Sequence, residues 1–319
     1  MAGPRLRAGL AALAALAPLT LALLVGYANA GRGTGTAANG STAAKIAFVD
    51  VGQGDGVVMK IGAKIIVSDA GQFNYENIDA ALNAVGATRI DVAILSHPHS
   101  DHVTDFLQLF DEWKVKKAVM SPSAYWRGDT TNRAVMRAIT DEGLTPTYVH
   151  AGQTFSWGGA SWLILNPLKG EFTGGANDAA DSSVAYLLEV NGANVLFTGD
   201  IDMAVSKELA ARLPPLEGRL DVFLVTHHGS KYASPQELLD LTRPRYAVLS
   251  TGPNSFGHPT AQTISRLEAV PATIWCTAVN GTITATIAPS GKLSWSASAR
   301  KTPWWSASTK KETGSCVGR

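Results

Sequence analysis

Histidine and aspartate are concentrated in one short stretch, residues 96–102. It reads Ser-His-Pro-His-Ser-Asp-His and follows the run Val-Ala-Ile-Leu, which is typical of a buried strand. A hydrophobic core would leave three imidazoles and a carboxylate desolvated, so metal binding is the better interpretation. His97 and His99 alternate along an extended backbone and point the same way, whereas Asp101 and His102 can aim at a second position. The spacing therefore predicts two adjacent metal ions.

Later stretches place more polar residues directly after apolar runs. Asp200 follows a glycine, where it can either reach into a cleft or cap the next helix. His227 and His228 end another run and repeat the arrangement of the first motif. The glycine that follows, with Ser230 and Lys231, offers backbone N–H groups, a hydroxyl and an ammonium to an anion. We therefore expect a site assembled from separate strand ends.

The elements that must position these residues alternate along the chain. Residues 45–51, 56–61 and 64–67 read as strands joined by tight turns, and residues 77–85 read as a helix. Strands and helices then alternate to residue 287, and no internal repeat is visible. Two sheets with helices outside satisfy this pattern. A single doubly wound sheet is the alternative, but it fits the early hairpins poorly.

The ordered motifs resemble those of a known family. Residues 97–102 are similar to the HxHxDH signature of the metallo-β-lactamase fold, a superfamily of mostly dinuclear zinc hydrolases. Four further stretches occur in the order seen in the extracellular hydrolase domain of ComEC-type competence proteins: residues 48–55, 197–200, 227–231 and 257–259. The resemblance covers residues 45–287. It implies an α/β fold of the αββα sandwich type that holds two divalent metal ions, with zinc as the first choice.

The resemblance also implies roles for single residues. Metal ligands would be His97, His99, Asp101, His102, Asp200 and His227, with Asp200 bridging the two ions. His227 is preferred to His228 because it is nearer to the strand, so His228 would orient a ligand or face the substrate. His258 would contact a substrate phosphate or protonate the leaving oxygen. A histidine between Gly257 and Pro259 is also typical of a surface turn.

One position departs from the family pattern. The superfamily usually supplies a third histidine to the first metal just before the strand at residues 184–190, and this sequence has none there. It offers Asp178, Asp181, Ser182 and Ser183 instead. With only two histidines and a bridging carboxylate, the first ion would need Asp181, a serine or water to complete four-coordination. Oxygen ligands in place of nitrogen make manganese the alternative to zinc.

Three aspartates at predicted strand ends have a simpler explanation. Asp50, Asp55 and Asp69 all lie near glycines, where aspartate is common in tight turns. We assign Asp55 to a turn and keep Asp69 as a partner that orients a ligand. His150 lies far from other ligand-like residues and is assigned a structural role.

The first thirty residues differ in composition from the rest. Two arginines precede an almost purely apolar run, and Ala-Asn-Ala at residues 28–30 fits a cleavage site. This is the plan of a secretory signal peptide, with an uncleaved membrane anchor as the alternative. Residues 31–44 are rich in Gly, Thr, Ala and Ser and are expected to form a flexible linker. We therefore expect a hydrolase domain at residues 45–289 that is secreted or extracytoplasmic, with no stable membrane span after cleavage.

Composition bounds the remaining possibilities. A hydrophobic content of 45% suits one large domain, and a net charge of +1 argues against a massively basic nucleic-acid wrapper. Residues 290–319 form a basic tail whose tryptophans either stack nucleobases or dock on the domain. Cys276 and Cys316 either form one disulfide or remain thiols.

These observations favour a secreted metal-dependent hydrolase, a phosphodiesterase or nuclease in which two metal ions activate a water molecule. Asp101 would orient that water, and Lys231 and His258 would stabilise the phosphoryl oxygens and the leaving group. The substrate would be nucleic acid or another phosphodiester. The alternatives are a β-lactam or lactone hydrolase of the same fold and a non-catalytic module for DNA binding or uptake.

Overall fold

A computed structural model describes residues 42–170, 178–216 and 219–298. The described residues all belong to one compact unit, which begins at Gly40. The predicted signal peptide and most of the predicted linker lie outside the described residues, as do residues 299–319 of the tail.

The first sheet is antiparallel at one side and parallel at the other. Among the described residues its strands are β1 (Ala44–Phe48), β2 (Gly56–Ile61), β3 (Lys64–Ala70), β4 (Val92–Leu95), β5 (Ala118–Met120), β6 (Thr147–Tyr148), β14 (Ile283–Ile287) and β15 (Leu293–Ala297). They lie in the order β15-β14-β1-β2-β3-β4-β5-β6. Neighbours from β15 to β3 are antiparallel, and neighbours from β3 to β6 are parallel.

The second sheet repeats this plan. Its described strands are β7 (Thr154–Trp157), β8 (Ala160–Asn166), β9 (Ala185–Val190), β10 (Ala193–Phe197), β11 (Val222–Leu224), β12 (Tyr246–Leu249) and β13 (Thr273–Cys276). Antiparallel hairpins join β7 to β10, and the strands from β10 to β13 are parallel. Each sheet therefore ends in parallel strands whose carboxyl ends share one edge.

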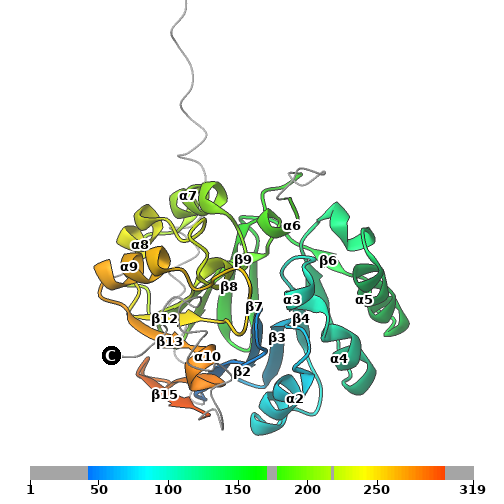
Figure 1. The fold of residues 1–319 in the computed structure, drawn as a ribbon. Helices are drawn as coiled ribbons and strands as arrows, with labels where there is room; N and C mark the ends of the chain where they lie inside the picture. The colour runs from blue at the N-terminus through cyan, green and yellow to red at the C-terminus, as the bar shows by residue number, and fades with distance from the viewer. Residues whose placement is uncertain (1–41, 171–177, 217–218, 299–319) are drawn as a thin grey trace, which may run out of the picture. The chain divides into compact units, whose positions relative to one another are not determined.

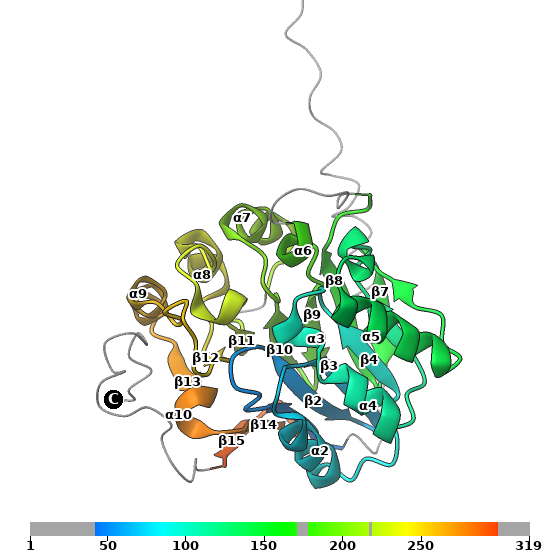
Figure 2. The same cartoon turned by 45° about the vertical axis from the view of Figure 1, so that its right-hand side comes forward.

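Helices cover the outer face of each sheet, as Figures 1 and 2 show. The first sheet is covered by α2 (Tyr75–Ala84), α4 (Phe106–Glu112) and α5 (Thr130–Asp141), and the second by α7 (Met203–Arg212), α8 (Gln236–Thr242) and α9 (Ala261–Ala269). Short helical segments complete the described chain: α3 (Ser100–Val103), η1 (Ala124–Arg127), α6 (Asp178–Asp181), η2 (Thr226–Gly229) and α10 (Thr277–Asn280).

The core between the sheets is aromatic and aliphatic. Phe48 of the first sheet stacks on Phe197 of the second with ring centroids 6.3 Å apart, and Tyr186 stacks on Phe197 at 4.6 Å. Residues of both sheets share this buried cluster, whereas two further clusters join each sheet to its own helices. The order helices, sheet, sheet, helices confirms the predicted αββα sandwich.

Two of the differences between the predicted and the observed elements concern the site and the domain boundary. The composition of residues 174–181 predicts a loop, but the end of this segment forms α6. The sequence predicts that the hydrolase domain ends at residue 289, but β15 adds a further strand beside β14. Trp295 of β15 packs against Tyr246 and Trp275, with ring centroids 4.8 and 5.6 Å apart. This tryptophan therefore docks on the domain. Trp304 and Trp305 lie outside the described residues, so the two interpretations of the tail stay predictions.

Two further predictions concern the chain's surroundings and its cysteines. In the described part of the chain, no helix is both long enough and apolar enough to span a membrane. Cys276 is buried at the end of β13, and Cys316 lies outside the described residues, so their pairing stays a prediction.

Candidate metal centre

The site lies where the parallel halves of the two sheets meet. The loop after β4 carries the histidines of the first motif, the loop after β10 carries Asp200, and η2 after β11 carries His227 and His228. Parallel strands present their carboxyl ends at one edge, which is where ligands bind in open α/β sheets. Facing edges of two sheets thus bring together residues more than 100 positions apart, such as His102 and His228.

The first group of donor atoms consists of His97, His99 and Asp200, whose ligand atoms all lie within 4.8 Å of one another. His97 is fully buried, and its Nε2 lies 3.8 Å from Asp200 Oδ2. The two histidine rings meet edge to face with centroids 4.7 Å apart. Alternation along the extended backbone therefore places these two rings side by side, as the sequence predicts.

The second group consists of Asp55, His102, Asp200 and His228, all buried and again within 4.8 Å of one another. The Nε2 atoms of His102 and His228 are 3.3 Å apart. His228 Nε2 also lies 3.4 Å from Asp200 Oδ2 and 3.4 Å from Asp101 Oδ2. Asp200 belongs to both groups, which is the geometry expected of a carboxylate that bridges two ions.

Hydrogen bonds at the far side of each ring fix which nitrogen faces the site. His102 Nδ1 lies 2.9 Å from Asp69 Oδ2, and His228 Nδ1 lies 3.0 Å from the carbonyl oxygen of Ser250. Asp69 also accepts from Ser96, from its backbone N–H at 2.8 Å and from its hydroxyl at 2.6 Å. Such partners of ligating histidines set the tautomer and the ring orientation. Asp69 thus lies where the sequence indicates, as the partner of a histidine.

The donor set fits divalent cations. His97 Nε2 and Asp55 Oδ1 are buried without a hydrogen-bond partner among the described residues. Buried polar atoms are usually paired, so one unpaired donor atom in each of the two groups fits the binding of a cation by each group. Imidazole and carboxylate together are ligands for zinc and manganese.

The electrostatics agree with this assignment. Burial lowers the pKa of His97 well below its usual value, which leaves the neutral imidazole that binds metals. Burial alone also lowers the pKa of His102 and His228, but the Asp200 carboxylate and its acidic neighbours outweigh it, so both pKa values rise well above normal. The buried carboxylates therefore favour positive charge at this place, which divalent cations would supply.

The backbone of η2 turns its two histidines in different directions. Both adopt positive φ, 51° for His227 and 53° for His228, a conformation that is uncommon outside glycine. His228 is buried in the second group, whereas a third of the His227 side chain is exposed. His227 Nε2 lies 3.7 Å from Asp200 Oδ2, and its ring faces His258 with centroids 5.5 Å apart. The resemblance favours His227 over His228 as the last ligand of the second ion, and the geometry favours the reverse.

Other predicted site residues lie around the two groups. The Asp181 carboxylate accepts from the backbone N–H of Asp202 at 2.8 Å and belongs to neither group. Ser183 accepts from the N–H of Asp200 at 3.0 Å and so positions the bridging carboxylate. Lys231 is exposed and lies over the Tyr232 ring at 4.9 Å.

Two more predicted residues follow the same loops. The Ser230 hydroxyl accepts from the backbone N–H of Tyr232 at 3.3 Å. His258 is mostly buried and its Nδ1 has no hydrogen-bond partner among the described residues. Burial lowers its pKa to about 4, helped by the neighbouring His228 and His227, so the ring is neutral at pH 7. His150 bonds its own turn through Ala151 and Gln153, which agrees with a structural role.

Asp55 is the residue that sequence reasoning misses. Its place beside glycine indicates a turn, yet it lies in the second group, with Oδ1 3.5 Å from His228 Nδ1. The sequence does contain a signal for Asp55. Like Asp69, it lies next to a strand end at the sheet edge where residues 97–102 also lie. Gly54 allows the approach, since a Cβ there would overlap the carbonyl oxygen of Asp101.

Comparisons with known proteins agree with this geometry. The family described as the metallo-beta-lactamase superfamily matches residues 49–252. ComE operon protein 3 of Bacillus subtilis (strain 168) is 25% identical over 268 residues, which are 76% of this chain and 33% of that protein. Competence protein ComA of Neisseria gonorrhoeae is 28% identical over 235 residues, 71% of this chain and 30% of that protein. The chain thus spans about a third of the length of these relatives.

Solved structures show the same fold. Igni18, a metallo hydrolase from Ignicoccus hospitalis KIN4/I, has a TM-score of 0.50 at 16% identity, over 76% of this chain and 98% of that one. The metallo-beta-lactamase fold protein YhfI from Bacillus subtilis has a TM-score of 0.50 at 12% identity, over 80% of this chain and 100% of that one. The family match covers more than half of the chain, and the sandwich and the shared-carboxylate centre agree with it. The chain belongs to the metallo-β-lactamase superfamily.

Proposed function

We propose that this protein is an extracytoplasmic, metal-dependent phosphodiesterase that acts on nucleic acid. The observation that carries the proposal is the pair of donor groups that share the buried Asp200. Two-metal centres of this kind serve hydrolysis, in which both the attacking and the leaving oxygen need stabilisation. The chemistry that divalent cations supply in such a centre is a more acidic water molecule and a polarised phosphoryl oxygen.

The residues around the donor groups have separate tasks. The Asp101 carboxylate lies 3.4 Å from His228 Nε2 and is a quarter exposed, so it can accept a hydrogen bond from the attacking water and orient it. His258 is neutral at pH 7 because its pKa is about 4. It therefore binds a phosphoryl oxygen as a hydrogen-bond donor and does not act as an imidazolium acid. The exposed ammonium of Lys231 attracts the phosphate from the rim.

Exposed aromatic side chains support a nucleic-acid substrate. The described large hydrophobic residues that are well exposed include Phe73, Tyr148, Tyr232 and Phe256. Each lies at or beyond the carboxyl end of a strand, on the edge that holds the metal centre. Aromatic side chains beside a phosphate site stack nucleobases without regard to sequence. A β-lactam or lactone needs no such row of ring surfaces.

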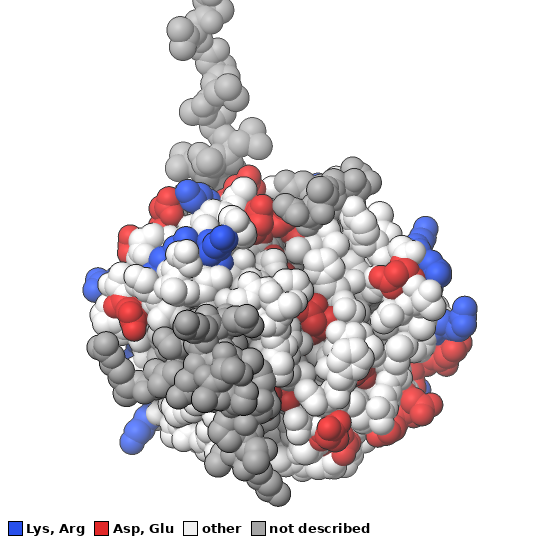
Figure 3. Space-filling view, in the orientation of Figure 1, with Lys and Arg blue, Asp and Glu red and all other residues white. Residues whose placement is uncertain are grey.

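The surface charge fits a local phosphate site better than an extended basic groove. On the face in Figure 3, acidic side chains lie near the middle as well as at the margins, whereas basic side chains lie toward the margins, near α8 and α9 on one side and near α5 on the other. Cations bound among the acidic groups would reverse the local charge. The relatives named for competence, and Recombination protein 2 of Haemophilus influenzae at 27% identity, also favour a nucleic-acid substrate. Action outside the cytoplasm rests on the signal-like first thirty residues.

The test is hydrolysis by purified protein supplied with zinc or manganese, on single-stranded DNA, double-stranded DNA and a chromogenic phosphodiester. We expect cleavage of at least one phosphodiester and its loss in Asp200→Asn. Leu241→Ala, an exposed change in α8, is the control that should keep wild-type rates. Turnover of a chromogenic cephalosporin without phosphodiester cleavage would assign the centre to lactam hydrolysis instead. Tight DNA binding without cleavage in either metal would indicate a binding module.

A further inference from the structure

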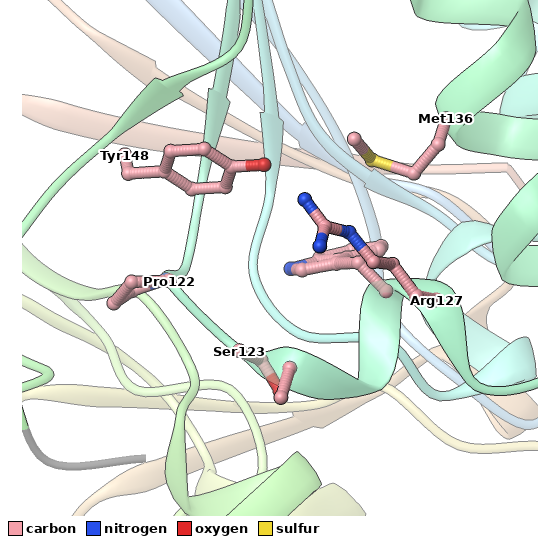
Figure 4. Close-up of a pocket in the computed structure, with 7 residues that line it drawn as sticks. Pro122, Ser123, Arg127, Met136 and Tyr148 are labelled. Atoms are coloured by element: carbon pink, nitrogen blue, oxygen red, sulfur yellow. The ribbon is translucent and has the colours of Figure 1, made fainter. Parts of the chain in front are cut away.

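A hollow separate from the two donor groups lies beyond the carboxyl ends of β5 and β6 (Figure 4). Its volume is about 330 Å³, at the lower end of the range of small-ligand sites. It is lined by Pro122, Ser123, Ala124, Trp126, Arg127, Met136 and Tyr148. We call it the Tyr148 pocket.

The walls of the Tyr148 pocket are flat and polarisable. Tyr148 is 46% exposed, and its hydroxyl points into the hollow toward the Arg127 side chain (Figure 4). Met136 contributes a thioether on the other side (Figure 4), and thioethers pack well against rings. Trp126 is almost fully buried and donates from Nε1 to the carbonyl oxygen of Ser121 at 2.9 Å, so this part of the wall is fixed.

The charge in the pocket is a single guanidinium. Arg127 is exposed and forms no ion pair with any residue that the structure describes. A guanidinium offers only donors, and it matches ligands whose edges carry acceptor atoms. A planar ring with acceptors on its edge and a face to stack on Tyr148 satisfies both features. Nucleobases have this chemistry.

The pocket is mechanically connected to the metal centre. Asn132, in the first turn of α5, donates from Nδ2 to the carbonyl oxygen of Pro98 at 3.0 Å. Pro98 lies between the two histidines of the first donor group. The same amide reaches the carbonyl oxygen of Tyr125 in η1 at 3.4 Å. One side chain therefore links the pocket wall to the metal-binding loop.

The pocket is also near enough to serve the same substrate. The strands β4, β5 and β6 are consecutive neighbours in the sheet. Neighbouring strands lie about 4.8 Å apart, so the pocket begins on the order of 10 Å or less from the end of β4. A nucleotide adjoining a phosphate at the metal centre can span that separation.

We propose that the Tyr148 pocket binds one nucleobase of the substrate, next to the phosphodiester held at the metal centre. The base stacks on Tyr148, and its acceptor edge faces Arg127. This inference rests on the proposed phosphodiesterase function, because it names the part of the substrate that lies beside the cleaved bond.

Equilibrium binding without metal tests the pocket apart from catalysis. The probes are a fluorescein-labelled single-stranded octanucleotide and the same backbone with abasic residues, in chelator, followed by fluorescence anisotropy. We expect Tyr148→Ala to weaken binding of the base-bearing probe by about tenfold, because stacking on one aromatic ring has roughly that effect. Binding of the abasic probe should not change. Leu241→Ala, another exposed side chain, should bind both probes like the wild type.

A second variant and a kinetic readout complete the test. Arg127→Gln should also weaken binding of the base-bearing probe more than that of the abasic one. In metal-loaded protein, Tyr148→Ala should raise KM for the octanucleotide and leave kcat unchanged. Equal loss on both probes, or no loss on either, would overturn the inference.

The two proposals fail in distinguishable ways. If the wild type cleaves no phosphodiester but Tyr148→Ala still loses base-dependent binding, the pocket stands and the phosphodiesterase function falls. If cleavage is robust and base-dependent binding is untouched, the pocket assignment falls alone.

Discussion

At the scale of single residues, His227 and His228 show how neighbours in sequence acquire different environments. Both follow β11, and both have left-handed backbone angles, but only His228 has each ring nitrogen committed. Its Nδ1 faces the carbonyl oxygen of Ser250, and its Nε2 faces His102 and two carboxylates. His227 is partly exposed and lies between Asp200 and His258. His228 therefore suits a metal ligand, and His227 suits a substrate contact.

This difference gives a prediction about metal content. His228→Ala should lose one of two bound metal equivalents and lower kcat/KM by roughly 100-fold or more, since it removes a ligand. His227→Ala should keep both equivalents and mainly raise KM. Elemental analysis after dialysis, alongside steady-state kinetics, measures both effects. Metal loss in His227→Ala with full retention in His228→Ala would instead support His227 as the ligand, as the family resemblance implies.

A second prediction concerns Asp91, which precedes β4 and is far from the donor groups. Its carboxylate accepts from the N–H of Ile65 at 3.2 Å and lies 3.3 Å from both Lys64 Nζ and Arg89 Nε. Burial alone would raise the pKa of Asp91, but the Ile65 N–H and the Lys64 ammonium outweigh it and lower the pKa. A lowered pKa means stability that is present above the unfolded value of about 3.9 and lost as the pH falls through the folded pKa.

Asp91→Asn should therefore destabilise the domain at pH 7 by about 1 to 3 kcal/mol, the usual cost of disrupting a buried charged hydrogen-bond group. The difference from the wild type should shrink below about pH 4, because the Asp91 carboxylate of the unfolded wild type is then protonated, and it should vanish as the pH falls through the lowered folded pKa. Urea unfolding at several pH values measures it. Asp111→Asn, at an exposed position of α4, is the matched control and should show little change at any pH. A difference that persists undiminished at pH 3 would contradict this account.

The sequence specifies many site residues but not their exact partners. Four of the seven residues named as potential metal ligands lie in the two donor groups: His97, His99, His102 and Asp200. Each follows an apolar run, and strand ends gather at a sheet edge. The sequence does not show which of His227 and His228 joins the second donor group, because that depends on two positive φ angles that sequence does not reveal. Asp55 is not predicted as a site residue, because aspartate beside glycine is common in tight turns. Only the folded chain places it near His228.

At the scale of elements, the loop between β1 and β2 is fitted closely against the metal-binding loop. Gly54 has a φ of 127°, and a Cβ at this position would overlap the backbone of Asp101. Ser250 also donates to the carbonyl oxygen of Gly54 at 2.7 Å. The loop is thus held between the two sheets, and it places Asp55 in the second donor group.

Gly54→Ala should consequently separate this loop from Asp101. We expect a loss of stability of about 1 to 3 kcal/mol from backbone strain and a loss of most activity, since Asp55 and Asp101 both shift. Gly192→Ala is the matched control, because Gly192 also has a positive φ of 78° but no atom lies within 4 Å of the place that an added methyl group would take. It should lose about 1 kcal/mol and keep its activity. Thermal unfolding and phosphodiesterase rates measure the two effects. Full activity in Gly54→Ala would contradict the close contact between this loop and Asp101.

Element prediction succeeds where periodicity is strong and fails where polar residues obscure it. The strand before the metal motif and the helices that follow it are identified from apolar runs and spacing. β15 falls in the predicted tail because its sequence Leu-Ser-Trp-Ser-Ala is half polar and adjoins basic residues. Its alternation is a strand signal all the same, since Leu293 and Trp295 pack against the inter-sheet core.

At the scale of the whole domain, the metal centre lies between two sheets of the same design. Each sheet runs from antiparallel hairpins into parallel strands. On one side, the donor-group residues follow β4 or lie in the loop between β1 and β2, and on the other side they follow β10 and β11. Cations bound there would join the two halves, so occupancy should stabilise the folded domain.

Zinc or manganese at a hundred times its dissociation constant should add about 2.7 kcal/mol to the unfolding free energy. For a domain of this size that corresponds to a rise in Tm of roughly 5 to 10 °C. Chelator should reverse the rise, and Asp200→Asn, which removes a carboxylate shared by both groups, should abolish most of it. Scanning calorimetry with and without metal measures the shift. An unchanged Tm across metal concentrations would argue against cation binding in the folded state.

The pairing of β1 with β14 has a consequence for the order in which the domain can form. Ala44 lies opposite Ile287, so the first strand that the structure describes is completed by a strand made much later in synthesis. Contacts so distant along the chain slow folding, and until β14 arrives one side of β1 is an open edge able to pair with other chains. A translation product that stops before residue 283 would retain that edge permanently, and should accumulate as aggregates or be degraded rather than persist as a smaller working enzyme.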